Sequence, residues 1–573
     1  MDFMNEYKKW LAFEDLEKNL KDELVDIEND SAQIEDRFHK SLEFGTAGLR
    51  GILGAGTNRM NVYTVRQATQ GLSEYIKKSG KMGSVVIAYD SRNFSPEFSL
   101  ESAKVLCANG IKTYLFDSLR PTPELSYAVL ELGCTAGIVV TASHNPAEYN
   151  GYKVYGEDGG QLSPEVADTV TEEIQRIDIL TGPKIMSEKE ALQAGLLEYI
   201  GEEIDKKYLE RVYEQSVNKN AIKDVSDSFS VVYTPFHGSG NKLVREVLRM
   251  SGLKNLLVVK EQEMPDGNFP TVKSPNPEDK EGFTLAIELA KKNGTDLIIG
   301  TDPDSDRVGI VVRNNEGEYV AFTGNQVGAL LTDYILSQYK ETNTMPPNPA
   351  VIRSIVSTDM VCAIAKAYGA QLVDVLTGFK FIGEKINQYN EDNSHTFVFG
   401  FEESYGYLKG TYAHDKDAVV ASMLIVEMAA WYKKQGKTLF DAMQELYDKY
   451  GMYCEGVVNI VERGLDGPEK IASMIAKVRT DCPKEIGVVK VDALRDYKTG
   501  EISYSDGRKG KTTLPKSNML YLDLDEGKGW VAIRPSGTEP KLKLYFGYCD
   551  KDKQKAHNTL EMIKETFVKL ITQ

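Results

Sequence analysis

Closely spaced cysteines are missing from this sequence. Its 573 residues include six cysteines, and no two of them form a CxxC pair. Zinc ribbons need such pairs, and small disulfide scaffolds need a much higher density of cysteine. The spacing therefore indicates neither class and predicts reduced thiols, with the cytoplasm as the expected location.

An excess of positive charge is missing as well. The chain has 68 lysines and arginines against 85 aspartates and glutamates, which gives a net charge of -17. Nucleic acids and anionic membrane surfaces require basic patches that neutralise phosphate. We expect neither partner, and we expect any bound phosphate to be held by a local cluster of basic groups.

An unbroken apolar stretch is absent from the N-terminal segment. Residues 1–24, MDFMNEYKKWLAFEDLEKNLKDEL, carry charges throughout. A signal peptide or a membrane span needs a continuous apolar run. The segment instead predicts a solvated, amphipathic helical arm.

What the sequence does contain is a repeated alternation of strand-like and helix-like segments. The first series runs SVVIAYD (84–90), a helical stretch (95–110), IKTYLFD (111–117) and AGIVVTASHNP (136–146). This order is typical of βαβ units and a largely parallel sheet. The rhythm restarts twice, and a smaller α+β pattern follows it. The predicted domains are 1–208, 209–323, 324–450 and 451–573.

In each predicted domain a short apolar strand runs straight into a polar loop. Open α/β sheets bind ligands just beyond the carboxyl ends of their strands. Four such loops could therefore line one cleft. They are VVTASHNP (139–146), IIGTDPDSD (298–306), VFGFEESYG (398–406) and AIRPSGTEP (532–540).

The first loop presents Ser143 at the tip of a strand turn, a position that suits a nucleophile. Asn145 and Pro146 stop the chain from continuing as a regular strand or helix. A hydrolase triad is disfavoured, because the GxSxG elbow is absent and because adjacent Ser143 and His144 need not face each other. Two interpretations stay open: a nucleophile, or a serine that satisfies backbone donors in the turn.

Three carboxylates alternate along the second loop, at Asp302, Asp304 and Asp306. Packed carboxylates repel one another unless a cation lies among them. A hard divalent ion with oxygen ligands, most economically Mg²⁺, explains the pattern. An EF-hand is excluded because Arg307 would replace its sixth-position glycine. A solvated acidic turn is the alternative.

The third and fourth loops carry groups that suit a sugar and a phosphate. Glu402 and Ser404 offer an acceptor and a hydroxyl, although paired glutamates are also common on surfaces. Arg534 is followed by two hydroxyls and a glycine, the residue types of a phosphate cradle, and an ordinary β-turn is the alternative. Arg50 lies in a fifth small-residue loop, FGTAGLRG (44–51), and Lys153 follows shortly after the serine; each suits either a phosphoryl group or a solvated surface.

Together these loops resemble those of the α-D-phosphohexomutases, which include phosphoglucomutases and phosphomannomutases. TASHNP matches the phosphoserine loop, GTDPDSDR the metal loop, GFEESYG the sugar loop and RPSGTEPK the phosphate loop, in the family's order. The metal loop departs from the common DGDGDR form at Pro303 and Ser305, which bears on its flexibility. The resemblance implies three related α/β domains with mixed sheets and a C-terminal α+β domain resembling the TATA-box-binding-protein fold, around a central cleft.

The resemblance also implies roles for individual residues. Ser143 would be phosphorylated in the active form, and its phosphate would bind one Mg²⁺ together with Asp302, Asp304 and Asp306. The other implied roles are stabilisation of phosphoryl charge by Arg50 and Arg307, catalysis at His144, and proton transfer by Lys153. Sugar binding is implied for Thr377, Gly378, Glu402 and Ser404, contact with phosphate or a sugar hydroxyl for Lys416, and binding of the non-reacting phosphate for Arg534, Ser536, Gly537 and Thr538.

The reaction that the resemblance implies is an intramolecular phosphotransfer of the isomerase class. It interconverts α-D-glucose 1-phosphate and D-glucose 6-phosphate, with glucose 1,6-bisphosphate as intermediate and activator. Mannose and pentose phosphates are alternative substrates, and a phosphosugar phosphatase or a non-catalytic phosphosugar-binding protein is an alternative of a different kind. The expected partners are small phosphosugars, and the expected state is a monomer or a dimer.

Overall fold

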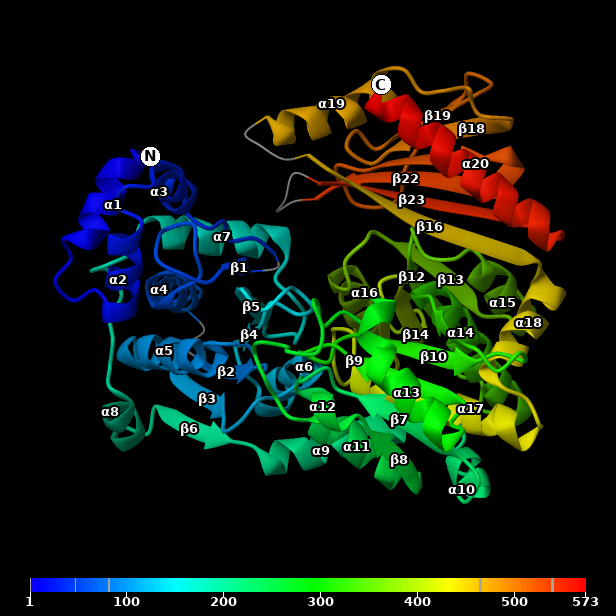
Figure 1. Cartoon of the computed structure of the whole chain (residues 1–573), viewed down its shortest axis with the longest axis horizontal. Helices are drawn as coiled ribbons and strands as arrows, with labels where there is room; N and C mark the ends of the chain where they lie inside the picture. The colour runs from blue at the N-terminus through cyan, green and yellow to red at the C-terminus, as the bar shows by residue number, and fades with distance from the viewer. Residues whose placement is uncertain (1, 47, 81–82, 463–465, 537–540) are drawn as a thin grey trace. The chain divides into compact units, whose positions relative to one another are not determined.

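The computed structural model describes residues 2–46, 48–80, 83–462, 466–536 and 541–573 (Figure 1). Two compact units make up the chain. The first contains Met1–Phe322, Ile382–Gly400 and Ser404–Thr438, and the second contains Thr323–Phe381, Phe401–Glu403 and Leu439–Gln573. Within the described ranges, none of the helices combines the length and the apolar character needed to span a membrane.

The N-terminal arm is helical, as its sequence predicts. Its helices are α1 (Phe3–Leu11), α2 (Lys18–Asp26) and α3 (Ser31–Phe38). Trp10 is fully buried and packs edge-on against Phe38 and Tyr63. One face of the arm therefore lies in an apolar core, and the arm is less solvated than its charges alone suggest.

The first α/β domain is built on a six-stranded sheet. Its elements are β1 (Leu49–Ile52), α4 (Val62–Lys78), β2 (Ser84–Tyr89), α5 (Ser95–Ala108), β3 (Lys112–Phe116), α6 (Thr122–Leu132), β4 (Ala136–Val140), β5 (Tyr149–Gly156), α7 (Pro164–Gln175), α8 (Glu188–Gln193) and β6 (Leu197–Ile200). The strand order is β1-β5-β4-β2-β3-β6. Strand β5 is antiparallel to both neighbours and the other pairs are parallel, so the sheet is mixed.

The second α/β domain repeats this plan with five strands. Its elements are α9 (Glu202–Glu214), α10 (Ala221–Val225), β7 (Ser230–Thr234), α11 (Gly240–Met250), β8 (Asn255–Val258), α12 (Lys260–Glu263), η1 (Lys280–Phe283), α13 (Thr284–Asn293), β9 (Leu297–Thr301), β10 (Val308–Arg313) and β11 (Tyr319–Phe322). The order is β11-β10-β9-β7-β8. Strand β7 pairs in parallel with β8 and β9, and β10 is antiparallel to β9 and β11.

Both sheets contain a strand that is buried along its whole length, β4 in the first and β9 in the second. An apolar strand covered on both faces carries no polar side chain until the chain leaves the sheet. The polar loops therefore begin where these strands end. This is the feature of the fold that positions the site.

The second unit contains a further α/β region and the C-terminal domain. The α/β region has β12 and β13 paired in parallel. The chain passes from one unit to the other within α16 and again within β14. Strand β15 and helix α17 belong to the first unit. The bounds are α14 (Gly324–Glu341), β12 (Pro349–Ser354), α15 (Met360–Tyr368), β13 (Gln371–Val375), α16 (Lys380–Asp392), β14 (Thr396–Glu402), β15 (Gly406–Leu408), α17 (Ala418–Lys434) and α18 (Leu439–Tyr450).

The C-terminal domain has an antiparallel sheet in the order β16-β23-β22-β21-β18-β19-β20. The bounds are β16 (Met452–Val461), α19 (Gly467–Thr480), β17 (Glu485–Ile486), β18 (Val489–Asp496), β19 (Glu501–Tyr504), β20 (Lys509–Lys511), β21 (Leu520–Leu524), η2 (Asp525–Gly527), β22 (Gly529–Pro535), β23 (Lys541–Asp550) and α20 (Lys553–Thr572). Helix α20 packs on this sheet (Figure 1). Phe567 of α20 lies edge-on against Phe546 of β23. The predicted α+β character of this region is confirmed.

Candidate active site

Ser143 lies in the turn that follows β4 and has a positive φ of 53°. This left-handed conformation is unfavourable for serine, so neighbouring groups must hold it. The Ser143 backbone N–H donates a 2.7 Å hydrogen bond to the Thr141 hydroxyl, which donates a 2.6 Å bond to the buried carboxylate of Asp90. These bonds fix the turn that presents the serine.

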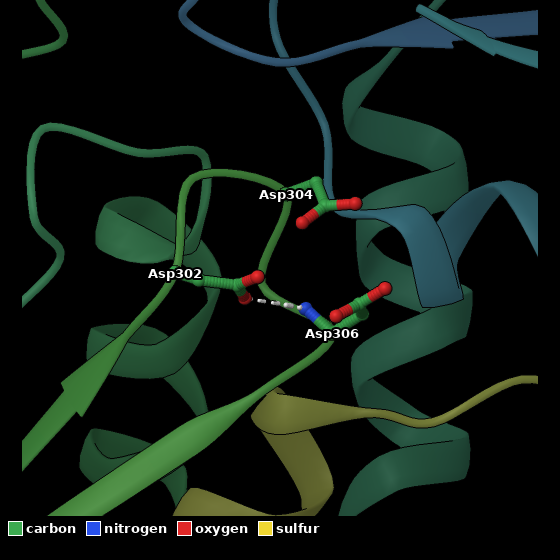
Figure 2. Close-up of side chains that lie close together, drawn as sticks. All are labelled: Asp302, Asp304 and Asp306. Atoms are coloured by element: carbon green, nitrogen blue, oxygen red, sulfur yellow. Dashed lines mark hydrogen bonds between the residues drawn. The ribbon is translucent and has the colours of Figure 1, made fainter. Parts of the chain in front are cut away.

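Three carboxylates converge in the loop between β9 and β10. Asp302, Asp304 and Asp306 are buried, and one oxygen of each lies within 4.8 Å of the others. Figure 2 shows the three side chains close together on this loop. Asp302 Oδ1 accepts hydrogen bonds from the backbone N–H groups of Asp306, at 3.1 Å, and Arg307, at 2.9 Å. The loop thus folds around one of its own carboxylates.

The two loops meet at the serine hydroxyl. Ser143 Oγ donates a 2.9 Å hydrogen bond to Asp302 Oδ2. The same oxygen lies 3.1 Å from Nδ1 of His144. Since Ser143 and Asp302 come from different sheets, the fold itself brings together a hydroxyl and three carboxylates.

Two buried lysines neutralise part of this acidic cluster. Lys153 Nζ lies 2.7 Å from Asp304 Oδ2 and 3.4 Å from Asp306 Oδ2. Lys416 Nζ lies 2.9 Å from Asp306 Oδ2. The structure therefore places both lysines that the sequence singles out beside the carboxylates.

Burial and the neighbouring charges shift the pKa values of these groups. Burial raises the pKa of the Asp302 carboxyl well above its usual range, and the charges of Asp304 and Asp306 raise it further. Burial alone would lower the pKa of Lys153, but the same two aspartates raise it above its ordinary value. Burial, with Arg307 and Arg50 nearby, lowers the pKa of His144 well below its ordinary value, so its ring is neutral at neutral pH.

The cluster fits a divalent cation. Asp304 Oδ1 and Asp306 Oδ1 are buried, and neither accepts a hydrogen bond from the described residues. A buried carboxylate oxygen without a partner is costly, and a hard cation with oxygen ligands would remove that cost. The donor set, three carboxylates beside a serine hydroxyl, is the type that Mg²⁺ prefers.

Comparison with known proteins gives the family. The phosphoglucomutase/phosphomannomutase family matches the chain with its α/β/α domains I, II and III at residues 41–180, 206–317 and 323–450, and with its C-terminal domain at residues 522–565. A phosphoglucomutase of Staphylococcus aureus (strain USA300) is 38% identical over 536 residues, which cover 93% of this chain and 93% of that protein. The chain belongs to the phosphoglucomutase/phosphomannomutase family.

Solved structures of other phosphohexomutases share the fold. Pp63/parafusin, a phosphoglucomutase from Paramecium, matches in its open form with a TM-score of 0.67 and 16% identity, over 92% of this chain and 96% of that one. Aspergillus fumigatus N-acetylphosphoglucosamine mutase, in complex with GlcNAc-6P and magnesium, matches with a TM-score of 0.50 and 14% identity, over 97% of this chain and 100% of that one. The predicted fold class, three α/β domains and a C-terminal domain with an antiparallel sheet, is confirmed, and the chain is an isomerase of the phosphotransferase type.

The two arginines expected to stabilise phosphoryl charge in this phosphohexomutase lie beside the two loops. Arg50 lies in β1 and not in a loop as predicted, and its Nη1 donates a 3.2 Å hydrogen bond to the side chain of Asn145, two residues after Ser143. Arg307 Nη1 pairs with Glu278 at 2.9 Å, and its Nε lies 3.9 Å from Asp306 Oδ1. Both arginines are therefore placed by polar contacts next to the residues that they are expected to assist.

The residues expected to bind the sugar of a phosphohexomutase substrate are divided between the units. In the second unit, Glu402 Oε1 accepts a 2.6 Å hydrogen bond from the Gly378 N–H, which brings the sugar loop next to the loop that contains Thr377. Ser404 follows in the turn before β15 and belongs to the first unit, as does Lys416.

The residues expected to bind the non-reacting phosphate lie at the end of β22 and after it in the sequence, in the second unit. Arg534 lies in this strand, and the N–H of Ser536 donates a 2.7 Å hydrogen bond to the carbonyl of Lys541. Gly537 and Thr538 lie outside the described residues. The described part of this loop is therefore the end of a hairpin between β22 and β23.

Four site residues had no role in the sequence-based predictions: Asp90, Arg92, Thr122 and Asp415. Thr122, at the start of α6, donates hydrogen bonds to Asp304 from its N–H, at 2.8 Å, and from its hydroxyl, at 3.0 Å. Asp415 lies 3.2 Å from the Lys416 ammonium and accepts a 2.7 Å bond from Tyr155. A signal existed for Asp90 and Arg92, because DSR (90–92) also comes directly after a largely buried strand, β2.

Proposed function

We propose that this phosphohexomutase interconverts α-D-glucose 1-phosphate and D-glucose 6-phosphate through a phosphoserine at Ser143. The observation that carries the proposal is the 2.9 Å contact between the Ser143 hydroxyl and Asp302 within the cluster of three buried aspartates. The phosphoglucomutase relatives at 38% identity support glucose phosphates as the substrates.

In the proposed step, the bond between phosphorus and Ser143 Oγ breaks as phosphorus bonds to a hydroxyl oxygen of the sugar phosphate. The sugar hydroxyl loses its proton and Ser143 Oγ gains one, with Lys153 as the candidate relay: its ammonium gives a proton to Oγ, and the resulting amine takes the hydroxyl proton. The product is glucose 1,6-bisphosphate, which returns its other phosphate to Ser143. Phosphoryl transfer depends mainly on alignment and on charge stabilisation. We therefore assign Lys416, Arg50 and Arg307 to stabilising the negative charge on the phosphoryl oxygens. His144, whose ring is neutral, is assigned to contact the serine.

We assign Asp302, Asp304 and Asp306, together with the Ser143 phosphate, as the ligands of Mg²⁺. The Aspergillus mutase described above was crystallised with magnesium, which supports the same ion here. When bound, the ion would supply positive charge to the phosphoryl group. Asp304 Oδ1 and Asp306 Oδ1, which are buried and accept no hydrogen bond from the part of the chain that the structure describes, support this ligand set.

The remaining proposed contacts come from the sugar loop, the loop that contains Thr377 and the phosphate loop. Thr377, Gly378, Glu402 and Ser404 are assigned to sugar hydroxyls. The proposed phosphate-binding residues are Arg534, Ser536, Gly537 and Thr538. We further propose the domain boundaries 1–208, 209–323, 324–450 and 451–573, a monomer or a dimer, and a cytoplasmic location, which the cysteine spacing supports.

The test is a coupled assay of glucose 6-phosphate formation from glucose 1-phosphate, with Mg²⁺ and glucose 1,6-bisphosphate present. We expect turnover, and intact-protein mass spectrometry should detect one phosphate that is absent from the Ser143→Ala variant. A kcat/KM that is higher on mannose 1-phosphate or ribose 1-phosphate than on glucose 1-phosphate would make that sugar phosphate the preferred substrate. Sustained release of inorganic phosphate without isomer formation would identify a phosphatase and not a mutase. No turnover of any of these sugar phosphates would favour a non-catalytic binding protein.

A further inference from the structure

We propose that Arg92 is a positioning residue for phosphoryl transfer. Its guanidinium holds the backbone of the serine loop, residues 141–149, in the conformation that aims Ser143 at Asp302. Arg92 follows β2 and is 1% exposed. The inference rests on the proposed function, because it assigns Arg92 to the phosphoserine step of that reaction.

The guanidinium binds backbone carbonyl groups along the serine loop. Arg92 Nη2 donates hydrogen bonds to the carbonyl oxygens of Ser143, at 2.6 Å, and of Asn145. Arg92 Nη1 donates to those of Pro146, at 2.8 Å, and of Tyr149, at 3.1 Å. Because the guanidinium is planar and rigid, four carbonyls bound to it keep a fixed relative geometry.

Arg92 is itself fixed from two sides. Asp90 lies 3.4 Å from its Nε and accepts a 2.9 Å hydrogen bond from its backbone N–H. The ring of Phe269, a residue between β8 and β9, lies 5.0 Å from the guanidinium carbon. A buried cation over an aromatic face is stabilised by the ring. The same Asp90 accepts the Thr141 bond that fixes the Ser143 turn, so the two supports of the loop are joined.

The strain at Ser143 explains why the loop needs this support. A serine at φ 53° keeps that strained conformation only as long as neighbouring hydrogen bonds hold it. The apolar side chains of Ile138 and Val140 pack the sheet itself, whereas Arg92 bonds to loop carbonyls. Loss of the guanidinium should therefore displace the serine more than it destabilises the sheet, and small displacements of reacting groups strongly reduce the rate.

The experiment compares the full-length variants Arg92→Met, Arg92→Lys and Arg37→Met. Arg37 is the matched control, because it is also largely buried and bonds a carboxylate, Glu23, and a backbone carbonyl, that of Ala55, in the N-terminal region. Three experiments are made on each variant. They give the rate of Ser143 phosphorylation by glucose 1,6-bisphosphate, kcat and KM on the sugar phosphate that the wild type uses best, and amide hydrogen exchange of residues 141–149.

For Arg92→Met we expect a fall of about 100-fold in the phosphorylation rate and in kcat, with KM within about 3-fold of wild type. Arg92→Lys should lose about 10-fold, because an ammonium cannot span four carbonyls. Amide hydrogen exchange should become faster in residues 141–149 and should stay unchanged in the other strands of the first sheet. Arg37→Met should keep the wild-type kcat and the wild-type exchange of this loop.

An unchanged kcat in a folded Arg92 variant would overturn the proposal, and so would an equal fall in Arg37→Met. If Arg92→Met does not fold, Arg92→Lys decides, and failure of both to fold would show a purely structural role. A wild-type protein that takes up no phosphate at Ser143 contradicts the proposed function instead. Exchange of residues 141–149 still tests Arg92 in that case, and unchanged exchange in the Arg92 variants would overturn its role.

Discussion

The serine loop and the metal loop solve the same backbone problem in different ways. Each places a non-glycine residue in the left-handed region, Ser143 at φ 53° and Ser305 at φ 50°. The serine loop is held by the guanidinium of Arg92, which lies outside it, and by the hydroxyl of Thr141 at its start. The metal loop is held by its own backbone N–H groups, which bond to Asp302, and by additional bonds from Thr122 and Ala418.

The difference follows from what each loop must carry. The metal loop contains its own acceptor, a carboxylate that binds the loop's N–H groups and leaves other oxygens for a cation. The serine loop presents a group that is proposed to gain and lose a phosphate, so its side chain cannot serve as a permanent anchor. Its support therefore comes from residues outside the reacting group.

The largest expected effect is that of Ser143→Ala, which removes the proposed phosphate carrier and keeps both loop supports. Mutase activity should fall by at least about 1000-fold, because the step has no other acceptor. The melting temperature should stay within about 2 °C of wild type, as measured by calorimetry. Turnover at the wild-type rate would remove Ser143 from the mechanism.

Metal removal tests the other loop. Dialysis against EDTA should abolish most of the activity, and Mg²⁺ should restore it, because three buried carboxylates need a counter-charge. Asp306→Asn should weaken Mg²⁺ binding by at least about 100-fold in calorimetric titration. The control is Asp227→Asn, which alters an exposed ion pair with Lys254 and should leave Mg²⁺ binding unchanged.

Thr141→Val tests the support of the serine loop with a side chain of similar volume. It removes the acceptor of the Ser143 N–H and the donor to the buried Asp90. The free energy of unfolding should fall by about 1–3 kcal/mol in urea titration, because a buried carboxylate loses a partner. Thr113→Val, at a buried threonine that bonds to the Ile111 carbonyl at 3.2 Å, should cost less. An equal cost at both positions would contradict a special role for Thr141.

Ser305→Gly should have the smallest effect. Glycine removes the strain of the left-handed conformation, but it also gives the unfolded chain more freedom. The free energy of unfolding should therefore change by less than about 1 kcal/mol, and Mg²⁺ affinity should be unchanged. A larger loss of stability would mean that the Ser305 side chain, and not its backbone, holds the loop.

Local patterns predicted much of the fold and part of the site. Buried apolar strands that end in polar loops are visible in the sequence, and they led to Ser143 and the three aspartates. Arg92 also follows a buried strand, but its role escaped because its partners are backbone carbonyls about fifty positions along the chain, and a carbonyl group has no sequence signature. The left-handed turn at Ser305 was not predicted for a related reason. Serine rarely adopts this conformation, and the bonds to Asp302 that stabilise it form only when the loop is folded.

The contact between Lys416 and Asp306 has a consequence for biosynthesis. Asp306 is made more than a hundred residues before its ammonium partner, and Ser305 likewise waits for the Ala418 N–H that bonds to its carbonyl at 3.1 Å. A nascent chain halted on the ribosome before residue 416 would hold an acidic loop that lacks one of its cations. The acidic cluster with both of its lysines is therefore completed late in translation, after the first two sheets have left the exit tunnel.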